Sequence, residues 1–166
     1  SRQSRGLGDV YKRQLLELKK TSNYWINWIS KTPSFKEFNN EILRSALTLK
    51  LLTYEKTGAV LAAVTTSLPE TIGEERNWDY RFCWIRDASM VIKVITKLGH
   101  KNIVNNFIKF ILDIIPDKNE KLQIMYGING EKILTEKTLK HFAGYLDSSP
   151  VRIGNAAYSQ KQNDIY

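Results

Sequence analysis

The sequence predicts an all-α fold in which helices occur in pairs and long loops gather at one end, as in a helical barrel or bundle. Three observations favour this class. Apolar residues recur at steps of three and four in several separate segments, which is the spacing of an amphipathic helix. The two clearest segments, residues 88–99 and 102–116, are joined by only a few residues, so we expect them to be antiparallel neighbours. A long irregular stretch, residues 59–84, precedes them and is rich in aromatic and charged residues.

Residues 4–14 have the sequence SRGLGDVYKRQ, which is basic and aperiodic. No apolar core of about 7–15 residues follows the positive charges, so the run is not a secretory signal peptide. It can be back-translated, codon by codon, into DNA that resembles the transposase adaptor ligated to fragments in short-read sequencing. We therefore predict that residues 1–14 are an adaptor artefact and that residues 15–166 form one partial domain. A disordered basic arm for nucleic acid or a membrane is the alternative.

Two helices are predicted before the long loop. Residues 15–31 carry apolar side chains at partly helical spacing, and Pro33 ends the run. Residues 34–55 show the strongest periodicity in the chain, with Ser34 as the expected N-cap. The following KTG, residues 56–58, is expected to stop this second helix.

The remaining elements are predicted from turn and cap residues. Gly99 stands where the left-handed residue that ends a helix belongs, and Asn102 is expected to cap the next helix. Alternating residues around a glycine-bearing turn predict a short β-hairpin over residues 122–134. A short helix is predicted over residues 135–142, and Asn155 is expected to cap a last helix.

The charge and hydropathy of the chain argue against two classes of partner, nucleic acids and membranes. The formal net charge is +8, but residues 1–14 hold four basic residues and one acidic residue, so the rest of the chain carries +5. The lysines are scattered among acidic residues, and no run of five like charges occurs, so we predict no nucleic-acid partner. No apolar run approaches the roughly 18–20 residues that cross a bilayer, so we predict no membrane partner.

The single cysteine and the two histidines exclude further kinds of site. Cys83 alone cannot form an internal disulfide or a cysteine-rich zinc site. A single cysteine fits a reducing compartment, and we predict a cytoplasmic location. His100 and His141 have no cysteine or carboxylate at ligand spacing, so we predict no metal and no cofactor.

The densest group of polar and aromatic side chains lies in RNWDYRFCWIRDAS, residues 76–89, which holds three arginines, two aspartates and four aromatic residues. Tryptophan and tyrosine rings stack on the apolar faces of sugar rings, while aspartate accepts and arginine donates hydrogen bonds to vicinal hydroxyls. Arg86 and Asp87 are adjacent, so both reach one sugar only if the backbone bends there, as it does at the start of a helix. The alternative is a structural role, in which Arg–Asp ion pairs stabilise the loop and Trp78 and Trp84 lie in the core.

This motif and two later segments resemble the bacterial and archaeal branch of glycoside hydrolase family 15, which contains glucoamylases and trehalases. The segments that carry the resemblance are LKLLTYEKTGAVLAAVTTSLPETIGEERNWDYRFCWIRDAS, LQIMYGINGE and GYLDSSPVRIGNAAYSQKQNDIY. They follow the family's order, and the resemblance covers residues 44–166. The departures are small: Val64 stands where a proline is common, and Glu74 and Glu75 replace a more glycine-rich turn.

The resemblance implies an (α/α)6 barrel of six inner and six outer helices, of which this chain is an incomplete fragment with a short β-hairpin and long loops. The family's pocket takes the non-reducing end of an α-glucoside. Matched by motif, Arg86 and Asp87 hydrogen-bond the terminal glucose, and Tyr80 and Trp84 are pocket aromatics. The other positions that fall in family motifs are Trp78, Asp79, Met125, Tyr126 and residues 152–155, which include Arg152.

The resemblance also implies an inverting hydrolysis by two glutamates, a general acid and a general base, whose carboxyl groups lie about 6.5–9.5 Å apart. The family's acid follows a tryptophan downstream of QNDIY, and no Trp-Glu dipeptide occurs here. None of the ten glutamates matches a catalytic position, so we expect both residues to lie beyond Tyr166. The sequence therefore predicts a fragment of a glucoamylase-like or trehalase-like hydrolase that is inactive alone and recognises an α-glucoside or trehalose. The alternative is a small non-catalytic helical module that binds carbohydrate or nucleic acid.

Overall fold

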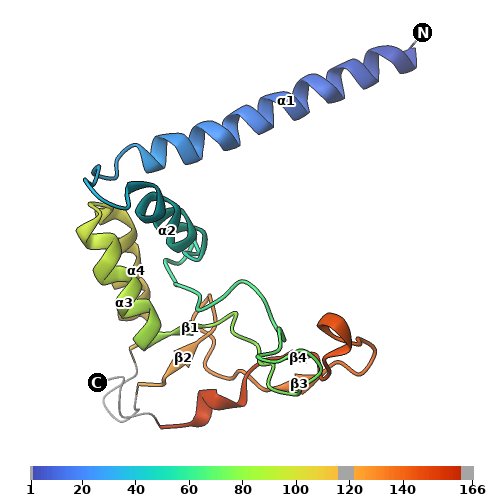
Figure 1. The fold of residues 1–166 in the computed structure, drawn as a ribbon, viewed down its shortest axis with the longest axis vertical. Helices are drawn as coiled ribbons and strands as arrows, with labels where there is room; N and C mark the ends of the chain where they lie inside the picture. Colours follow the sequence, from blue (N-terminus) through green and yellow to red (C-terminus); the bar gives the residue numbers. More distant parts are fainter. Residues whose placement is uncertain (1, 116–121, 162–166) are drawn as a thin grey trace. The chain divides into compact units, whose positions relative to one another are not determined.

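The computed structural model describes residues 2–115 and 122–161 and divides the chain into two compact units, residues 1–47 and 48–166. Helices predominate, and no barrel closes within the described ranges, so the predicted class, an incomplete all-α fragment with long loops, is confirmed (Figure 1). The elements in chain order are α1 Arg2–Ile29, α2 Asn39–Leu51, β1 Cys83–Trp84, α3 Ile85–Lys97, α4 Lys101–Ile114, β2 Met125–Tyr126, β3 Lys137–Thr138 and β4 Arg152–Ile153, with short 3-10 helices at Tyr145–Asp147 and Ala156–Ser159.

The first unit is dominated by α1, which confirms the helix predicted from residue 15 onward and ends at Ile29. The helix also includes residues 2–14, whose adaptor origin stays a prediction. Its apolar side chains are largely exposed, and Leu18 and Ile26 are each more than half exposed. None of the described helices has the length and hydropathy needed to cross a bilayer.

The second helix is shorter than predicted, because α2 covers Asn39–Leu51 rather than residues 34–55. Phe38 adopts a positive φ of 53°, a left-handed conformation that a helix does not contain. The side chain of Asn39 then accepts a hydrogen bond of 2.9 Å from the backbone N–H of Phe35. The expectation that Ser34 caps this helix is therefore wrong.

The second unit is built on α3 and α4, which lie side by side as an antiparallel pair and confirm the two helices predicted there (Figure 1). Gly99 has a φ of +84° and ends α3 as expected. Asn102 is not the cap, because α4 begins at Lys101 and is flanked by His100. The buried residues of the main core come from this pair and its neighbours: Ala59, Val60, Cys83, Ala88, Phe107, Phe110, Ile114 and Tyr126.

The two strand pairs join segments that are far apart in the sequence. β1 pairs antiparallel with β2, so that Trp84 lies opposite Met125. The turn expected in residues 122–134 is present, with the N–H of Gly130 donating to the carbonyl of Gly127 at 3.0 Å. The predicted hairpin itself is wrong, because the strand before this turn pairs with β1 and not with the residues after the turn.

The last part of the described chain is extended rather than helical. β3 pairs antiparallel with β4, with Thr138 opposite Arg152, so the helix predicted over residues 135–142 is wrong. The expected cap at Asn155 is confirmed, because its side-chain oxygen accepts a hydrogen bond from the N–H of Ala157 at 3.0 Å. The helix that it caps is the short 3-10 helix Ala156–Ser159.

Candidate functional site

Arg86 and Asp87 lie in the first turn of α3, where the chain changes from strand to helix. Trp84 has extended backbone angles and flanks the helix, so the bend that the two side chains need is present. One guanidinium nitrogen of Arg86 lies 3.4 Å from a carboxylate oxygen of Asp87. The two side chains are 33% and 41% exposed, so both are accessible to a ligand in solution. A carboxylate in the first turn is also favoured by the positive end of the helix dipole.

Trp84 supports this pair from the core side. Its ring is only 9% exposed and packs against Ile124, Met125 and Leu134. The guanidinium carbon of Arg86 lies 6.0 Å from the ring centroid, at the limit of a cation–π contact. The indole N–H is buried and has no hydrogen-bond partner within the described residues. Trp84 is therefore a largely buried aromatic side chain on the core side of the Arg86–Asp87 pair.

Tyr126 lies on the strand that pairs with β1, and it is 1% exposed. Its hydroxyl accepts a hydrogen bond from the N–H of Gln123 at 2.9 Å. The structure thus brings Tyr126 next to the Trp84–Asp87 segment but places it inside the core.

Trp78 and Tyr80 precede this segment in an extended stretch. Tyr80 is 39% exposed, and Trp78 is half-buried with the guanidinium carbon of Arg76 at 5.9 Å from its ring centroid. Between them, Asp79 is fully buried. The alternation of exposed and buried side chains is that of a strand with one face toward the core.

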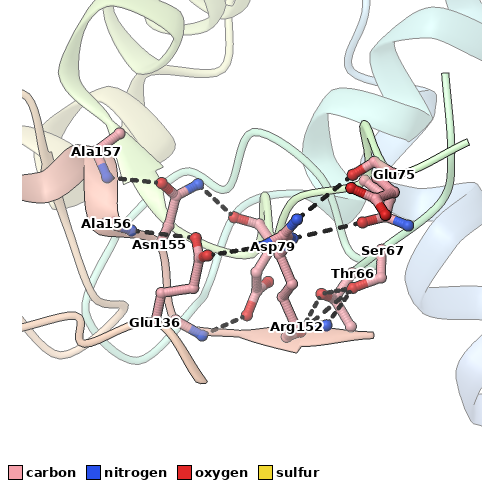
Figure 2. A network of polar contacts seen from close by, with 11 residues as sticks. Thr66, Ser67, Glu75, Asp79, Glu136, Arg152, Asn155, Ala156 and Ala157 are labelled. Carbon is pink, nitrogen blue, oxygen red and sulfur yellow. Dashed lines mark hydrogen bonds and ion pairs between the residues drawn. The ribbon is translucent and has the colours of Figure 1, made fainter. Parts of the chain in front are cut away.

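Asp79 is the centre of a group of hydrogen bonds that ties together several loops (Figure 2). One carboxylate oxygen accepts from the backbone N–H and the Nε of Arg81, at 3.1 and 2.9 Å. The other accepts from the Nη2 of Arg81 at 2.9 Å and from the N–H of Gly154 at 3.1 Å. The side chain of Asn155 donates to the carbonyl of Asp79 at 3.0 Å. The hydrogen bonds to Asp79 raise the pKa of the Arg81 guanidinium above its ordinary value.

Arg152 extends this group on the neighbouring strand (Figure 2). Its Nη1 donates to a carboxylate oxygen of Glu136 at 2.9 Å, and its Nε donates to the side-chain oxygen of Asn77 at 3.5 Å. Its backbone N–H and carbonyl bond the side-chain hydroxyls of Ser67 and Thr66, both at 2.7 Å. We call the five side chains that join these loops the loop network: Asn77, Asp79, Glu136, Arg152 and Asn155.

The structure therefore separates the predicted residues into two groups. Trp84, Arg86 and Asp87 form one continuous feature at the start of α3, with Tyr126 on the adjoining strand. The guanidinium of Arg152 is instead bonded within the loop network. Glu136 and Asn77 are not among the residues predicted from the sequence, and their partner Arg152 lies 16 and 75 residues away. No short-range pattern connects residues so far apart.

A cavity of about 640 Å³ borders the loop network at Asp79 and Gly154. Arg81 also lines it, and most of its remaining walls are apolar: Leu61, Val64, Phe82, Ile128, Ile133, Leu134 and Ile153. Of the positions carried over from the family, Asp79, Ile153 and Gly154 line this cavity, whereas Trp78, Tyr80, Trp84, Arg86, Asp87, Tyr126 and Arg152 do not. The cavity and the Arg86–Asp87 pair are therefore separate features.

The described residues offer little for metal or nucleophilic chemistry. Within them, no group of three histidine, cysteine or carboxylate side chains could hold a metal ion. Cys83 is fully buried, and burial raises the pKa of its thiol to about 11. A thiol in that state is protonated at neutral pH and is a poor nucleophile.

The structure is thus a fragment of paired helices that carries an arginine, an aspartate and a tryptophan together at the start of α3. The comparison with protein families gives the particular family. Residues 36–166 match the model for glycosyl hydrolases family 15, so the chain belongs to this family. No solved structure matches the chain.

Curated relatives cover most of this chain. A trehalase from Mycolicibacterium smegmatis is 47% identical over 162 residues, which is 95% of this chain and 24% of the relative. A trehalase from Mycobacterium tuberculosis is 47% identical over 88% of this chain and 22% of the relative. One from Thermoplasma acidophilum is 43% identical over 93% of this chain and 26% of the relative. The chain thus spans about a quarter of the length of these relatives.

Proposed function

We propose that this chain is the part of a trehalase-type glycosyl hydrolase that builds one side of the pocket for a terminal glucose. The observation that carries the proposal is the pairing of Arg86 with Asp87 in the first turn of α3, beside Trp84. The names of the relatives favour trehalose as substrate, because the three described above are all called trehalases. A glucoamylase-type role on another α-glucoside is the alternative within the family.

The chemistry of the pair suits a sugar with neighbouring hydroxyls. The Asp87 carboxylate only accepts hydrogen bonds and the Arg86 guanidinium only donates them. Two adjacent hydroxyls can therefore donate to one side chain and accept from the other. Charged partners make such hydrogen bonds stronger than those between neutral groups. The buried ring of Trp84 holds the base of the site rigid.

The proposal assigns the general acid and the general base to residues outside this chain, so we expect no hydrolysis by the chain alone. The glutamates nearest the loops support this assignment, because they are engaged elsewhere. Glu136 is bonded to Arg152, and Glu70 is paired with Arg76 at 2.9 Å. Glu131 accepts hydrogen bonds from the backbone and side chain of Asn129, at 3.0 and 2.8 Å.

A titration of the purified chain with trehalose, followed by NMR, tests the proposal. We expect weak, saturable binding with a Kd on the order of 1 mM, because only part of a site is present. Arg86→Ala and Asp87→Asn should each weaken binding by roughly tenfold or more, since each removes a charge-assisted hydrogen bond. Asp113→Asn, which removes an exposed carboxylate on α4, is the matched control and should change nothing.

Two outcomes would contradict the proposal. Equal binding by the wild-type chain and both variants would show that the pair does not contact the sugar. Glucose release from trehalose by the wild-type chain would show that a catalytic pair is present after all. Maltose, titrated in parallel, separates the trehalase-type from the glucoamylase-type role.

Two further parts of the proposal concern the chain's context. We propose that residues 1–14 derive from the adaptor, which sequencing the source DNA across the codon of Gln14 tests. We also propose a cytoplasmic location, supported by the single cysteine and its burial. Neither nucleic acid nor a membrane has a part in the proposed function.

A further inference from the structure

The segment that holds Trp78 and Tyr80 is attached to its neighbours at regular intervals along its backbone. The carbonyls of Trp78, Tyr80 and Phe82 accept hydrogen bonds of 3.0 Å from the N–H groups of residues 67, 63 and 62. Acceptors at every second residue are the pattern of an extended strand. In such a strand neighbouring side chains point to opposite faces, so Asp79 and Tyr80 face opposite ways. The hydrogen bonds that hold Asp79 on one face of the strand therefore also determine the direction in which Tyr80 points on the other face.

Asp79 is fixed by more hydrogen bonds than a simple ion pair with Arg81 requires. Its carboxylate accepts four hydrogen bonds, three from Arg81 and one from the N–H of Gly154. It is fully buried, whereas the Arg81 side chain is 44% exposed. A buried carboxylate that loses such partners is costly, so the geometry around it is held firmly.

Gly154 is suited to hold that carboxylate from the opposite loop. Its φ is +76°, a conformation that residues with a side chain rarely adopt. A Cβ at this position would overlap the carbonyl oxygen of Thr135. The next residue, Asn155, donates to the backbone carbonyl of Asp79. Residues 154 and 155 therefore hydrogen-bond both the side chain and the main chain of Asp79, and Figure 2 shows Asn155 beside Asp79.

We propose that Asp79 is a positioning residue that holds the Trp78–Phe82 segment so that Trp78 and Tyr80 have one orientation. The role in sugar binding rests on the proposed function. Asp79 does not contact the sugar, and it acts through the two aromatic side chains beside it. Trp84 is held in addition by the pairing of β1 with β2, although Phe82 packs against the same cluster, so its environment should depend less on Asp79 than those of Trp78 and Tyr80 do.

The test uses the complete 166-residue chain labelled with fluorotryptophan and, separately, fluorotyrosine, with signals assigned by substitution. In Asp79→Ala we expect the ¹⁹F signals of Trp78 and Tyr80 to broaden or split, and that of Trp84 to change less than either. Asp79→Asn keeps the shape and one of the two acceptor oxygens, and so at most two of the four hydrogen bonds, and its signals should be intermediate. The Kd for trehalose should rise roughly tenfold in Asp79→Ala, because small displacements of positioning groups have large effects. Asp113→Ala on α4 is the control and should leave both readouts unchanged.

The outcomes separate this inference from the proposed function. Sharp, unshifted Trp78 and Tyr80 signals in Asp79→Ala would overturn the positioning role, whatever the sugar affinity. Absence of trehalose binding by the wild type would overturn the proposed function, while the ¹⁹F spectra would still decide whether Asp79 orients the segment. If Asp79→Ala does not fold, Asn155→Asp serves instead. It keeps the acceptor for Ala157, removes the donor to Asp79, and should broaden the same two signals.

Discussion

The pair α3–α4 and the loop network are two parts of the same compact unit that are stabilised in opposite ways. The helices bury apolar side chains, among them Phe107, Phe110 and Ile114, against one another and their neighbours. The loop network buries hydrogen-bonding groups, with Asp79 fully enclosed. Its strands are only two residues long, so backbone pairing alone cannot hold these loops.

Because the two regions are stabilised differently, they should respond differently to a side-chain truncation. Apolar packing is spread over many weak contacts, and a truncation there leaves a cavity whose cost depends on its volume. A buried polar group depends on a few directional partners, and removal of one leaves the other unsatisfied. The predicted sugar-binding residues lie on both parts, since Arg86 belongs to the helix and Tyr80 to the loops.

The largest effect should come from truncating the helical core. Phe110→Ala should lower the free energy of unfolding by about 3–5 kcal/mol, because a buried aromatic ring is removed and a cavity remains. Denaturant unfolding followed by circular dichroism measures the change. Leu112→Ala, on the same helix and 64% exposed, is the matched control and should cost less than about 1 kcal/mol. Equal losses in the two variants would contradict the assignment of the buried face.

A pH titration probes the apolar core separately, because the chain's single thiol, that of Cys83, lies there. The pKa of Cys83 is raised by burial to about 11, so the folded state keeps the thiol proton in a range where the unfolded chain loses it. The unfolded state then binds fewer protons, and stability falls as the pH rises from about 9 to about 11. A pKa difference of about two between the folded and unfolded states corresponds to a fall of about 2–3 kcal/mol in the free energy of unfolding.

The unfolding free energy of the wild type and of Cys83→Ala, measured from pH 8 to pH 11, isolates this contribution. The variant lacks the thiol, so its curve should fall less steeply over this interval. Parallel curves would show that the thiol ionises as easily in the folded state as in the unfolded one.

The smallest expected effect comes from the loop network. Glu136→Ala should cost about 1–3 kcal/mol, because it leaves the partly buried guanidinium of Arg152 without its closest partner. Glu70→Ala breaks the ion pair with Arg76, whose side chains are at least half exposed, and should cost less than about 1 kcal/mol. Chemical denaturation of both variants tests the contrast. If the two losses are equal, the loop network contributes no more than a surface ion pair.

The sequence predicts the helical pair well because its stabilising pattern is local. Apolar residues at steps of three and four, with Gly99 between the helices, place α3 and α4 to within a few residues. The errors arise where the determining contact is distant or depends on an unusual backbone conformation. α2 begins at Asn39 rather than near residue 34 because Phe38 has a positive φ, and no residue type around Phe38 predicts this conformation. The strand β2 was given the wrong partner because its true partner is about forty residues earlier.

In the candidate site, too, the local features were predicted from the sequence and the distant contacts were not. The placement of Arg86 and Asp87 at a helix start was predicted from the residues, and the structure confirms that placement. The hydrogen bonds of Arg152 could not be predicted, because its partners come from loops as far as 75 residues away. Asp79 lay in the recognised motif, but its partner Gly154 was equally remote. Local patterns therefore predict where a side chain stands, while polar partners between loops need the folded structure.

The pairing of β1 with β2 has a consequence for the order in which the chain folds. Trp84 and Met125 meet only when a loop of about forty residues closes, which costs entropy before any contact compensates for it. α3 and α4 lie within that loop, and their formation shortens the distance over which its ends must search. During synthesis on a ribosome, Trp84 therefore gains its strand partner only after Tyr126 has emerged, about forty residues after Trp84 itself.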